Sequence, residues 1–243
     1  MPSLPSVREY RRIEFDTQAR SPLFSSLPTE LRLQVYDLVL NCSRIHLGFF
    51  EGRDGPHIEL GGNIVGVTPP EAILASRLLS LLLSCARAHA EALPLLYSLN
   101  TFCVVDTDVF RVLAYGVGAP FLTRLEVYLC RSYRPPLLPP WKSPTRWDSW
   151  LGKKHRRERK WARYWEPIKR FQSLQYLYIE LDPTDSLRRE WWRGGEAIIV
   201  KPLENLLREG ISGKLCLYWE RPGGHEMAAE EILDRWVVER VVN

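Results

Sequence analysis

A hydrophobic run long enough to cross a membrane is missing from this sequence of 243 residues. The most apolar stretch, residues 73–85, contains Arg77 and several serines, so it is too polar for a membrane span and is typical of a buried helix. The amino-terminal segment MPSLPSVREYRR also lacks the apolar run of a secretory signal. The sequence therefore predicts no membrane partner and no targeting segment.

Cysteine is scarce, and neither sign of charge dominates. The five cysteines are an odd, widely scattered set: Cys42, Cys85, Cys103, Cys130 and Cys216. Free thiols suit a reducing compartment better than a disulfide framework does, so we expect an intracellular protein, cytoplasmic or nuclear. The formal net charge of +4 is too small to indicate a class of partner by itself.

The motifs of enzymes and cofactor-binding proteins are equally absent. The sequence has no C-x-x-C, no H-E-x-x-H and neither of the glycine patterns that cradle phosphates. Cys85 and His89 are spaced i, i+4, which would place thiol and imidazole on one helix face. They lie among leucines and alanines with no identifiable oxyanion donor, so we interpret them as core residues. We expect no catalytic residue, no cofactor and no metal, with an uncharacterised enzyme as the distant alternative.

The clearest local signal is a short amphipathic helix at 27–40, with the sequence LPTELRLQVYDLVL. Pro28 suits the first helical position because it lacks an N–H and its φ is already helical, so we expect the helix to begin there. Glu30 complements the helix dipole in the first turn, and Asn41 is a stop signal. Apolar residues recur at helical spacing, with Tyr36 widening their face: Leu31, Val35, Leu38 and Val39.

The residues LPTELR, followed by Val35-Tyr36 and Val39-Leu40, resemble the opening helix of an F-box. They resemble still more the F-box-like start of a large fungal family of unknown function, and a second block, LLSCARAHAEALPLLYSLNTF at 82–102, agrees with that family. In an F-box the opening helix docks on the small adaptor subunit of a cullin-type ubiquitin ligase, and downstream repeats hold the substrate. The resemblance therefore implies a non-enzymatic, substrate-adaptor-like interaction module with these partner-binding residues: Leu27, Pro28, Leu31, Val35, Tyr36, Leu38 and Val39.

The segment after this helix departs from the three-helix pattern of an F-box. Two strand-like runs, 44–50 and 56–60, are separated by Gly52, Asp54 and Gly55. Glycine and aspartate at that separation predict a hairpin turn. The alternative to partner binding is that the apolar face of the 27–40 helix packs into the core of its own domain.

We expect three regions that form one compact unit. Residues 1–24 are predicted to be a flexible arm, 25–100 an F-box-like helical region with the hairpin, and 101–243 an α/β repeat-like region. Thr68-Pro69-Pro70-Glu71 combines a capping box with proline at the first helical position, which predicts a long helical segment toward Tyr97. Pro94 should produce a kink or a junction between two helices.

Beyond residue 100 strand and helix patterns alternate. The predicted strands are 101–105, 122–129, 174–181 and 213–219, and the predicted helices are 108–115, 156–171, 202–209 and 226–238. Strands separated by helices favour a parallel sheet, so the fold class is α/β, or α+β. The leucine-bearing strands resemble a short, irregular leucine-rich-repeat-like sheet, and an ordinary open α/β sheet is the alternative.

A proline- and tryptophan-rich loop at 131–152 interrupts this alternation, and a basic run follows it. The loop could present its tryptophans to a partner or fold back over the sheet. The basic run could serve nuclear import or phosphate contact: Lys153, Lys154, Arg156, Arg157, Arg159 and Lys160. Trp161, Tyr164, Trp165 and Ile168 have the spacing of a core-facing helix, which makes the charges its solvated side. A nuclear or nucleic-acid-associated protein is therefore the alternative to a protein-interaction module.

Overall fold

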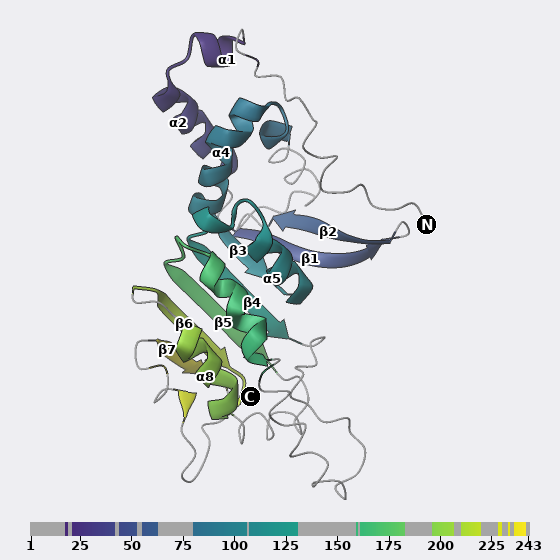
Figure 1. Ribbon diagram of the computed structural model, residues 1–243, viewed down its shortest axis with the longest axis vertical. Coiled ribbons are helices and arrows are strands. Elements are labelled where there is room, and N and C mark those ends of the chain that lie inside the picture. The colour runs from purple at the N-terminus through teal and green to yellow at the C-terminus, as the bar shows by residue number, and fades with distance from the viewer. Residues whose placement is uncertain are drawn as a thin grey trace, which may run out of the picture.

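All seven strands that the structure describes belong to one sheet, in the order β2-β1-β3-β4-β5-β6-β7 (Figure 1). The architecture is mixed α/β, as the sequence predicts. The computed structural model describes residues 18, 21–41, 44–52, 55–62, 80–105, 107–130, 159, 161–182, 196–206, 210–219, 228–229, 233 and 236–241.

The predicted hairpin forms one edge of this sheet. β1 (Arg44–Gly52) and β2 (Gly55–Gly62) are antiparallel, and their register runs from Ile45 opposite Gly62 to Gly52 opposite Gly55. β1 then pairs in parallel with the next strand, β3. The chain therefore continues from the 27–40 helix into the sheet, where an F-box would add helices.

From β3 onward each strand pairs in parallel with the next one along the chain. Four of these strands confirm the predicted ones: β3 (Thr101–Val104), β4 (Arg124–Cys130), β5 (Tyr176–Asp182) and β6 (Ser212–Leu217). The last strand, β7 (Val237–Arg240), includes two residues for which the sequence predicts a helix. That prediction is wrong at Val237 and Val238, because both valines pair with β6 and extend the sheet by one strand.

Helices cover one face of the sheet. α5 (Thr107–Tyr115), the helical residues 161–165 with the 3-10 helix η4 (Glu166–Arg170), and α8 (Glu196–Leu206) lie over this face in Figure 1. A further 3-10 helix, η2 (Ala119–Phe121), leads into β4. Alternate residues of β4 and β5 point into the layer beneath the helices, and all of them are buried: Leu125, Val127, Leu129, Leu177, Ile179 and Leu181. α8 begins before the predicted 202–209 and contains Pro202.

The aromatic residues of segment 161–171 form the centre of this layer. Trp161 and Trp165 are fully buried, which confirms the core face predicted for this helix, and Phe171 is fully buried beside them. The Phe110 ring of α5 packs on Trp165 and Phe171, with centroids 6.2 and 6.0 Å away. The indole Nε1 of Trp161 donates to the Ile199 carbonyl of α8 over 2.7 Å. Segment 161–171 thus joins α5 to α8 above the sheet.

Three helices stand beyond the sheet at one end of the molecule, at the top of Figure 1. They are α1 (Pro22–Ser25), α2 (Thr29–Leu40) and α4 (Ala86–Leu99), and α2 packs against α4. A break between two helical stretches lies at 83–85, and α4 continues through Pro94, so the predicted junction does not form at that proline. α2 begins one residue later than predicted, because Pro28 has an extended ψ of 153° and serves as the N-cap.

Candidate protein-binding surface on helix α2

Helix α2 packs through one side and turns most of its aliphatic residues to the surface. Its buried residues are Arg32, Tyr36 and Leu40, spaced i, i+4, i+8. The neighbouring side carries four aliphatic residues that are 45, 41, 83 and 45% exposed, in the order Leu31, Val35, Leu38 and Val39. Their spacing of i, i+4, i+7 and i+8 places them on one continuous side of the helix. We call these four residues the α2 stripe.

A fork of hydrogen bonds fixes the buried side of α2 to α4. The Nε of Arg32 donates to Glu91 Oε2 over 2.9 Å, and its Nη2 donates to Glu91 Oε1 over 2.7 Å. The same guanidinium also donates to the Leu27 carbonyl over 2.7 Å and to Thr29 Oγ1 over 2.9 Å. Arg32 is only 2% exposed, and four of its five N–H donors, together with its charge, have partners inside the protein.

The protonation states at this contact follow from the fork. The hydrogen bonds from Arg32 lower the pKa of Glu91 to about 2, with Arg87 adding to the effect and burial opposing it. Burial, followed by the Glu91 charge, raises the pKa of Tyr36. Tyr36 therefore stays a neutral phenol, and its hydroxyl donates to Glu91 Oε2 over 3.3 Å. The carboxylate of Glu91 is thus ionised and shared by α2 and α4 at neutral pH.

Helix α1 contributes Phe24 to the contact between α2 and α4. Phe24 is buried with Cys85 and Ala88 in a small apolar cluster. The guanidinium carbons of Arg32 and Arg87 lie 5.5 and 5.0 Å from the centroid of the Phe24 ring, within the range of a cation–π interaction. Arg32 of α2 therefore contacts both Phe24 of α1 and Glu91 of α4.

The carboxyl end of α2 is fixed by a buried amide. Asn100, which follows α4, is fully buried and donates from Nδ2 to the Leu40 carbonyl over 2.8 Å and to the Leu96 carbonyl over 2.9 Å. One side chain thus satisfies carbonyls at the ends of both helices. With Arg32 near the start of α2 and Asn100 at its end, the rotation of the helix about its axis is set.

This rotation decides where the predicted partner-binding residues lie. The α2 stripe and Pro28 are exposed, and Leu27 is half-buried. Tyr36 is a correction to the predicted set, because its ring is fully buried against α4 and cannot touch a partner. The alternative in which the whole apolar face enters the protein's own core is wrong for Leu31, Val35 and Leu38. That a partner binds the exposed stripe remains a prediction.

Sequence reasoning missed Arg32 and Glu91, which determine the orientation of α2. Helical spacing places Arg32 off the apolar side of the helix, and arginines in such positions are usually exposed. Its partner lies 59 residues away in the sequence, so no local spacing rule could connect the two. The Glu in the second family-like block is the signal that would have suggested a pair between the two blocks.

Cys85 and His89 are each engaged by backbone groups. Cys85 is the N-cap of α4 and has extended backbone angles, and its Sγ accepts from the Ala88 N–H over 3.3 Å. His89 Nδ1 lies 3.2 Å from the Leu82 carbonyl. Because Cys85 is a cap and not a residue within the helix, the predicted shared helix face does not form. Both side chains have structural partners.

The basic run falls almost entirely outside the described residues. Lys153, Lys154, Arg156, Arg157 and Lys160 lie there, as does the 131–152 loop. Arg159 is described and exposed. The aromatic residues that follow it, Trp161 and Trp165, are buried and offer no stacking surface.

Among the described residues no group of His, Cys, Asp or Glu is arranged to hold a metal ion. In the same part of the chain, every helix is too short or too polar to cross a membrane.

A comparison with protein families finds a family whose sequences resemble this chain. A family model described as a domain of unknown function, DUF7730, matches residues 16–219. The matched range contains α1, α2, α4 and the strands from β1 to β6. Searches of curated proteins and of solved structures find no match. Because the family match covers most of its 243 residues, the chain belongs to the DUF7730 family, a domain of unknown function.

Proposed function

We propose that the protein is a non-enzymatic protein-interaction module that docks a protein partner on the α2 stripe. The observation that carries this proposal is the exposure of Leu31, Val35, Leu38 and Val39 on a helix whose other side is locked by Arg32. A soluble protein exposes single apolar side chains routinely, but a contiguous apolar side of a helix is typical of an interaction site.

The geometry suits a partner with an apolar groove. Aliphatic residues at i, i+4 and i+7 are the anchors by which a helix binds in such a groove. Fully burying one aliphatic side chain contributes about 1.5–3 kcal/mol, and Leu38, the most exposed of the four, has the most to gain. Because the Arg32–Glu91 fork already holds α2 in place, little ordering entropy is lost on binding.

The partner we propose is the adaptor subunit of a cullin-type ubiquitin ligase, as the resemblance of LPTELR to a fungal F-box-like start implies. In an F-box the opening helix makes this contact. The second half of the protein would then hold a substrate. Successive parallel strands from β3 to β6, with helices on one face, support a leucine-rich-repeat-like substrate platform. The role is therefore that of a substrate adaptor.

The test is a binding measurement between purified adaptor subunit and the full chain. Val35→Asp combined with Leu38→Asp places two charges in the α2 stripe and should weaken binding at least tenfold, roughly the loss of one buried aliphatic anchor. Val112→Asp is the matched control, because Val112 is a 51% exposed aliphatic residue on α5, away from α2. Circular dichroism checks that all variants are folded.

Two results would overturn the proposal. One is an absence of binding by the wild-type protein. The other is equal binding by the wild type and the doubly substituted variant. Binding to some other protein that is lost in the same variant would keep the docking role of α2 and exclude the ligase adaptor as its partner.

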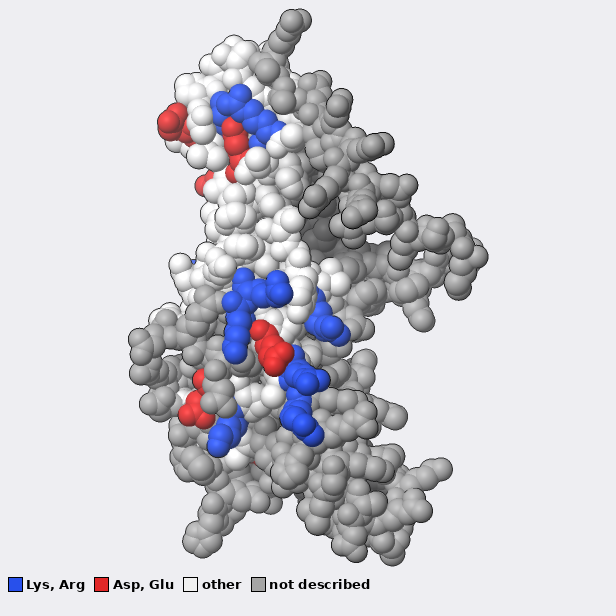
Figure 2. Space-filling model, in the orientation of Figure 1, with Lys and Arg blue, Asp and Glu red and all other residues white. Residues whose placement is uncertain are grey.

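A second candidate function is binding to nucleic acid. Figure 2 shows Lys and Arg side chains gathered over α5, the 161–170 segment and α8. Exposed cations in the first two of these elements are Arg111, Arg163, Lys169 and Arg170, with Glu166 among them. Strongly salt-dependent binding to DNA or RNA, weakened by Arg163→Gln with Lys169→Gln, would favour this function. Nucleic-acid binding that is unchanged by both substitutions would exclude this surface as the binding site.

A further inference from the structure

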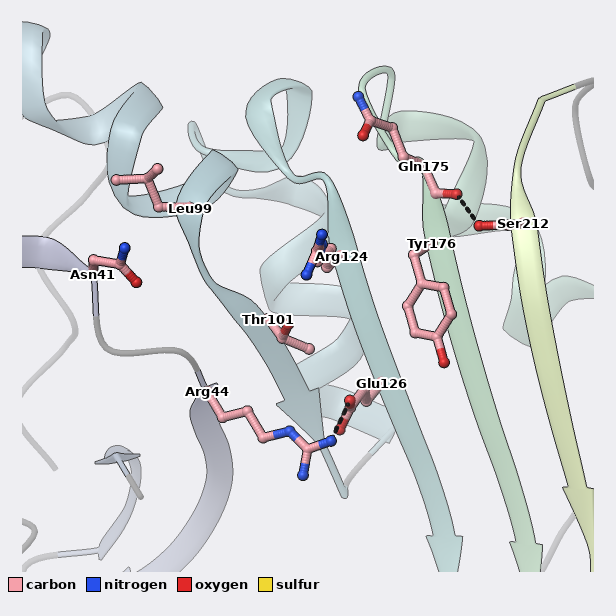
Figure 3. A pocket seen from close by; sticks show the side chains of 9 residues that line it. All are labelled: Asn41, Arg44, Leu99, Thr101, Arg124, Glu126, Gln175, Tyr176 and Ser212. Carbon is pink, nitrogen blue, oxygen red and sulfur yellow. Dashed lines mark hydrogen bonds and ion pairs between the residues drawn. The ribbon is translucent and has the colours of Figure 1, made fainter. Parts of the chain in front are cut away.

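A cavity of about 720 Å³ opens over the amino-terminal ends of the strands, on the sheet face opposite α5 and α8 (Figure 3). One residue from each of five neighbouring strands forms its floor, and these residues are paired in register: Arg44, Thr101, Arg124, Tyr176 and Ser212. They alternate along the strands with buried residues such as Leu125 and Leu177, which face the helices. The cavity is therefore separated from the hydrophobic core by the sheet itself.

Its lining carries a surplus of positive charge. The charged residues around it are Arg44, Arg124 and Glu126. Glu126 Oε1 accepts from Arg44 Nη2 over 3.0 Å, so these two charges compensate each other. Arg124 has neither an ion pair nor a hydrogen bond to its side chain from any other residue in the part of the chain that the structure describes. Its charge is thus available to an anion that enters the cavity.

The carboxylate of Glu126 accepts three hydrogen bonds beneath the cavity and holds Arg44 in position. Besides Arg44, it accepts from the Tyr128 hydroxyl over 2.6 Å and from the Cys103 thiol over 3.3 Å. Burial, together with the neighbouring carboxylate, raises the pKa of both donors, so both keep their protons at neutral pH. Arg44 itself is 48% exposed, so part of its guanidinium remains accessible from solvent.

The remaining groups suit a polar ligand of small-molecule size. Pockets of 300–1,000 Å³ are typical of small-molecule sites, and this volume lies within that range. Thr101, Gln175 and Ser212 supply hydroxyl and amide groups, and Tyr176 supplies an aromatic ring. Neighbouring strands are about 4.8 Å apart, so the Cα atoms of Arg44 and Arg124, which lie on either side of Thr101, are about 10 Å apart. Two arginine side chains can converge on one anionic group across that distance.

We propose that this cavity binds a small polar molecule through a carboxylate or phosphate group held between Arg124 and Arg44. Guanidinium groups recognise both kinds of anion with paired hydrogen bonds, so the shared chemistry is that of an oxyanion. Ligands of parallel α/β sheets usually bind at the carboxyl ends of the strands, whereas this cavity lies at the amino ends. The cavity therefore owes its affinity for an oxyanion to these residues and not to the usual ligand position of the fold, and none of them belongs to α2.

The experiment titrates the full chain with inorganic phosphate and, separately, with citrate, at constant ionic strength. Binding is followed by calorimetry and by amide shifts of Thr101, Arg124, Tyr176 and Ser212. We expect saturable binding of at least one probe, and Arg124→Gln should weaken it at least tenfold, as for the loss of one charge-assisted contact. The tighter probe identifies the phosphate or the carboxylate class.

Arg111→Gln is the matched control, because it removes one exposed arginine from α5, on the other face of the sheet. Arg124→Lys keeps the charge but not the fork, and should bind more weakly than the wild type and more tightly than Arg124→Gln. The proposal is overturned if neither probe saturates, or if Arg111→Gln weakens binding as much as Arg124→Gln does.

Discussion

The guanidinium of Arg32 and the carboxylate of Glu91 meet in a fork of two hydrogen bonds, 2.9 and 2.7 Å long, between α2 and α4. This pair occupies the side of α2 where an aliphatic residue would ordinarily pack. Leu31, Val35 and Leu38 consequently lie outside the contact and are exposed. A polar interaction thus determines which apolar residues of the helix remain available to a partner.

Glu91→Ala should destabilise the protein strongly. The substitution leaves the guanidinium of Arg32 in a site that is 2% exposed, without its carboxylate. Losing one member of a buried pair leaves an uncompensated charge, and we expect the melting temperature to fall by about 5 °C or more. Glu30→Ala is the control, because it removes an exposed carboxylate from the first turn of α2. Equal melting temperatures for the two variants would contradict the anchoring role.

The same pair predicts how stability depends on pH. The pKa of Glu91 falls from its usual value of 4.5 to about 2 in the folded protein, chiefly because Arg32 donates to it. Because the pKa of Glu91 is lower in the folded protein, this carboxylate binds more protons in the unfolded chain. Its contribution to the free energy of unfolding is therefore complete above pH 4.5 and is lost as the pH falls toward about 2. Urea midpoints of the wild type and Glu91→Gln, measured between these limits, should converge on acidification. A constant difference would show that Glu91 does not titrate in this way.

Gly213 of β6 is a site where a single methyl group should destabilise the protein. A Cβ there would overlap the Trp236 ring, and Trp236 is buried beside β7. Adding a methyl group to a packed contact forces the ring to shift and typically costs about 1–3 kcal/mol. Chemical denaturation of Gly213→Ala measures this cost. Ser212→Ala, at the exposed neighbouring position, serves as the control, and a loss of stability confined to that control would refute the packing argument.

The elements that were predictable from the sequence are those set by local chemistry. Turn-forming residues between two strand-like runs predict the β1–β2 hairpin, whose last pair is Gly52 opposite Gly55, and the spacing of Trp161 and Trp165 identifies a core-facing helix. β7 was missed because a four-residue strand carries little periodicity. Val237 and Val238 become a strand only when β6 is available to pair with them.

The two candidate sites could not be predicted in the same way, because each depends on residues far apart in the sequence. Helical spacing groups Leu31, Val35 and Leu38 on one side of α2, but it does not say whether that side faces the core. That depends on Glu91, which no local pattern connects to Arg32. The oxyanion cavity is harder still, since its floor takes one residue from each of five strands and exists only through their register.

A pair of leucines two positions apart on α2 gives the most direct test of the helix orientation. Leu38 is 83% exposed, so Leu38→Ala should change the free energy of unfolding by no more than about 0.5 kcal/mol. Leu40 is fully buried in the main core, and Leu40→Ala should cost about 2–5 kcal/mol through lost burial and the cavity left behind. Both substitutions remove the same atoms from the same helix, so propensity effects largely cancel in the comparison. Urea denaturation of the two variants measures the difference. If Leu38→Ala were the more destabilising of the two, α2 would be rotated in solution, and the exposed stripe could not be its docking surface.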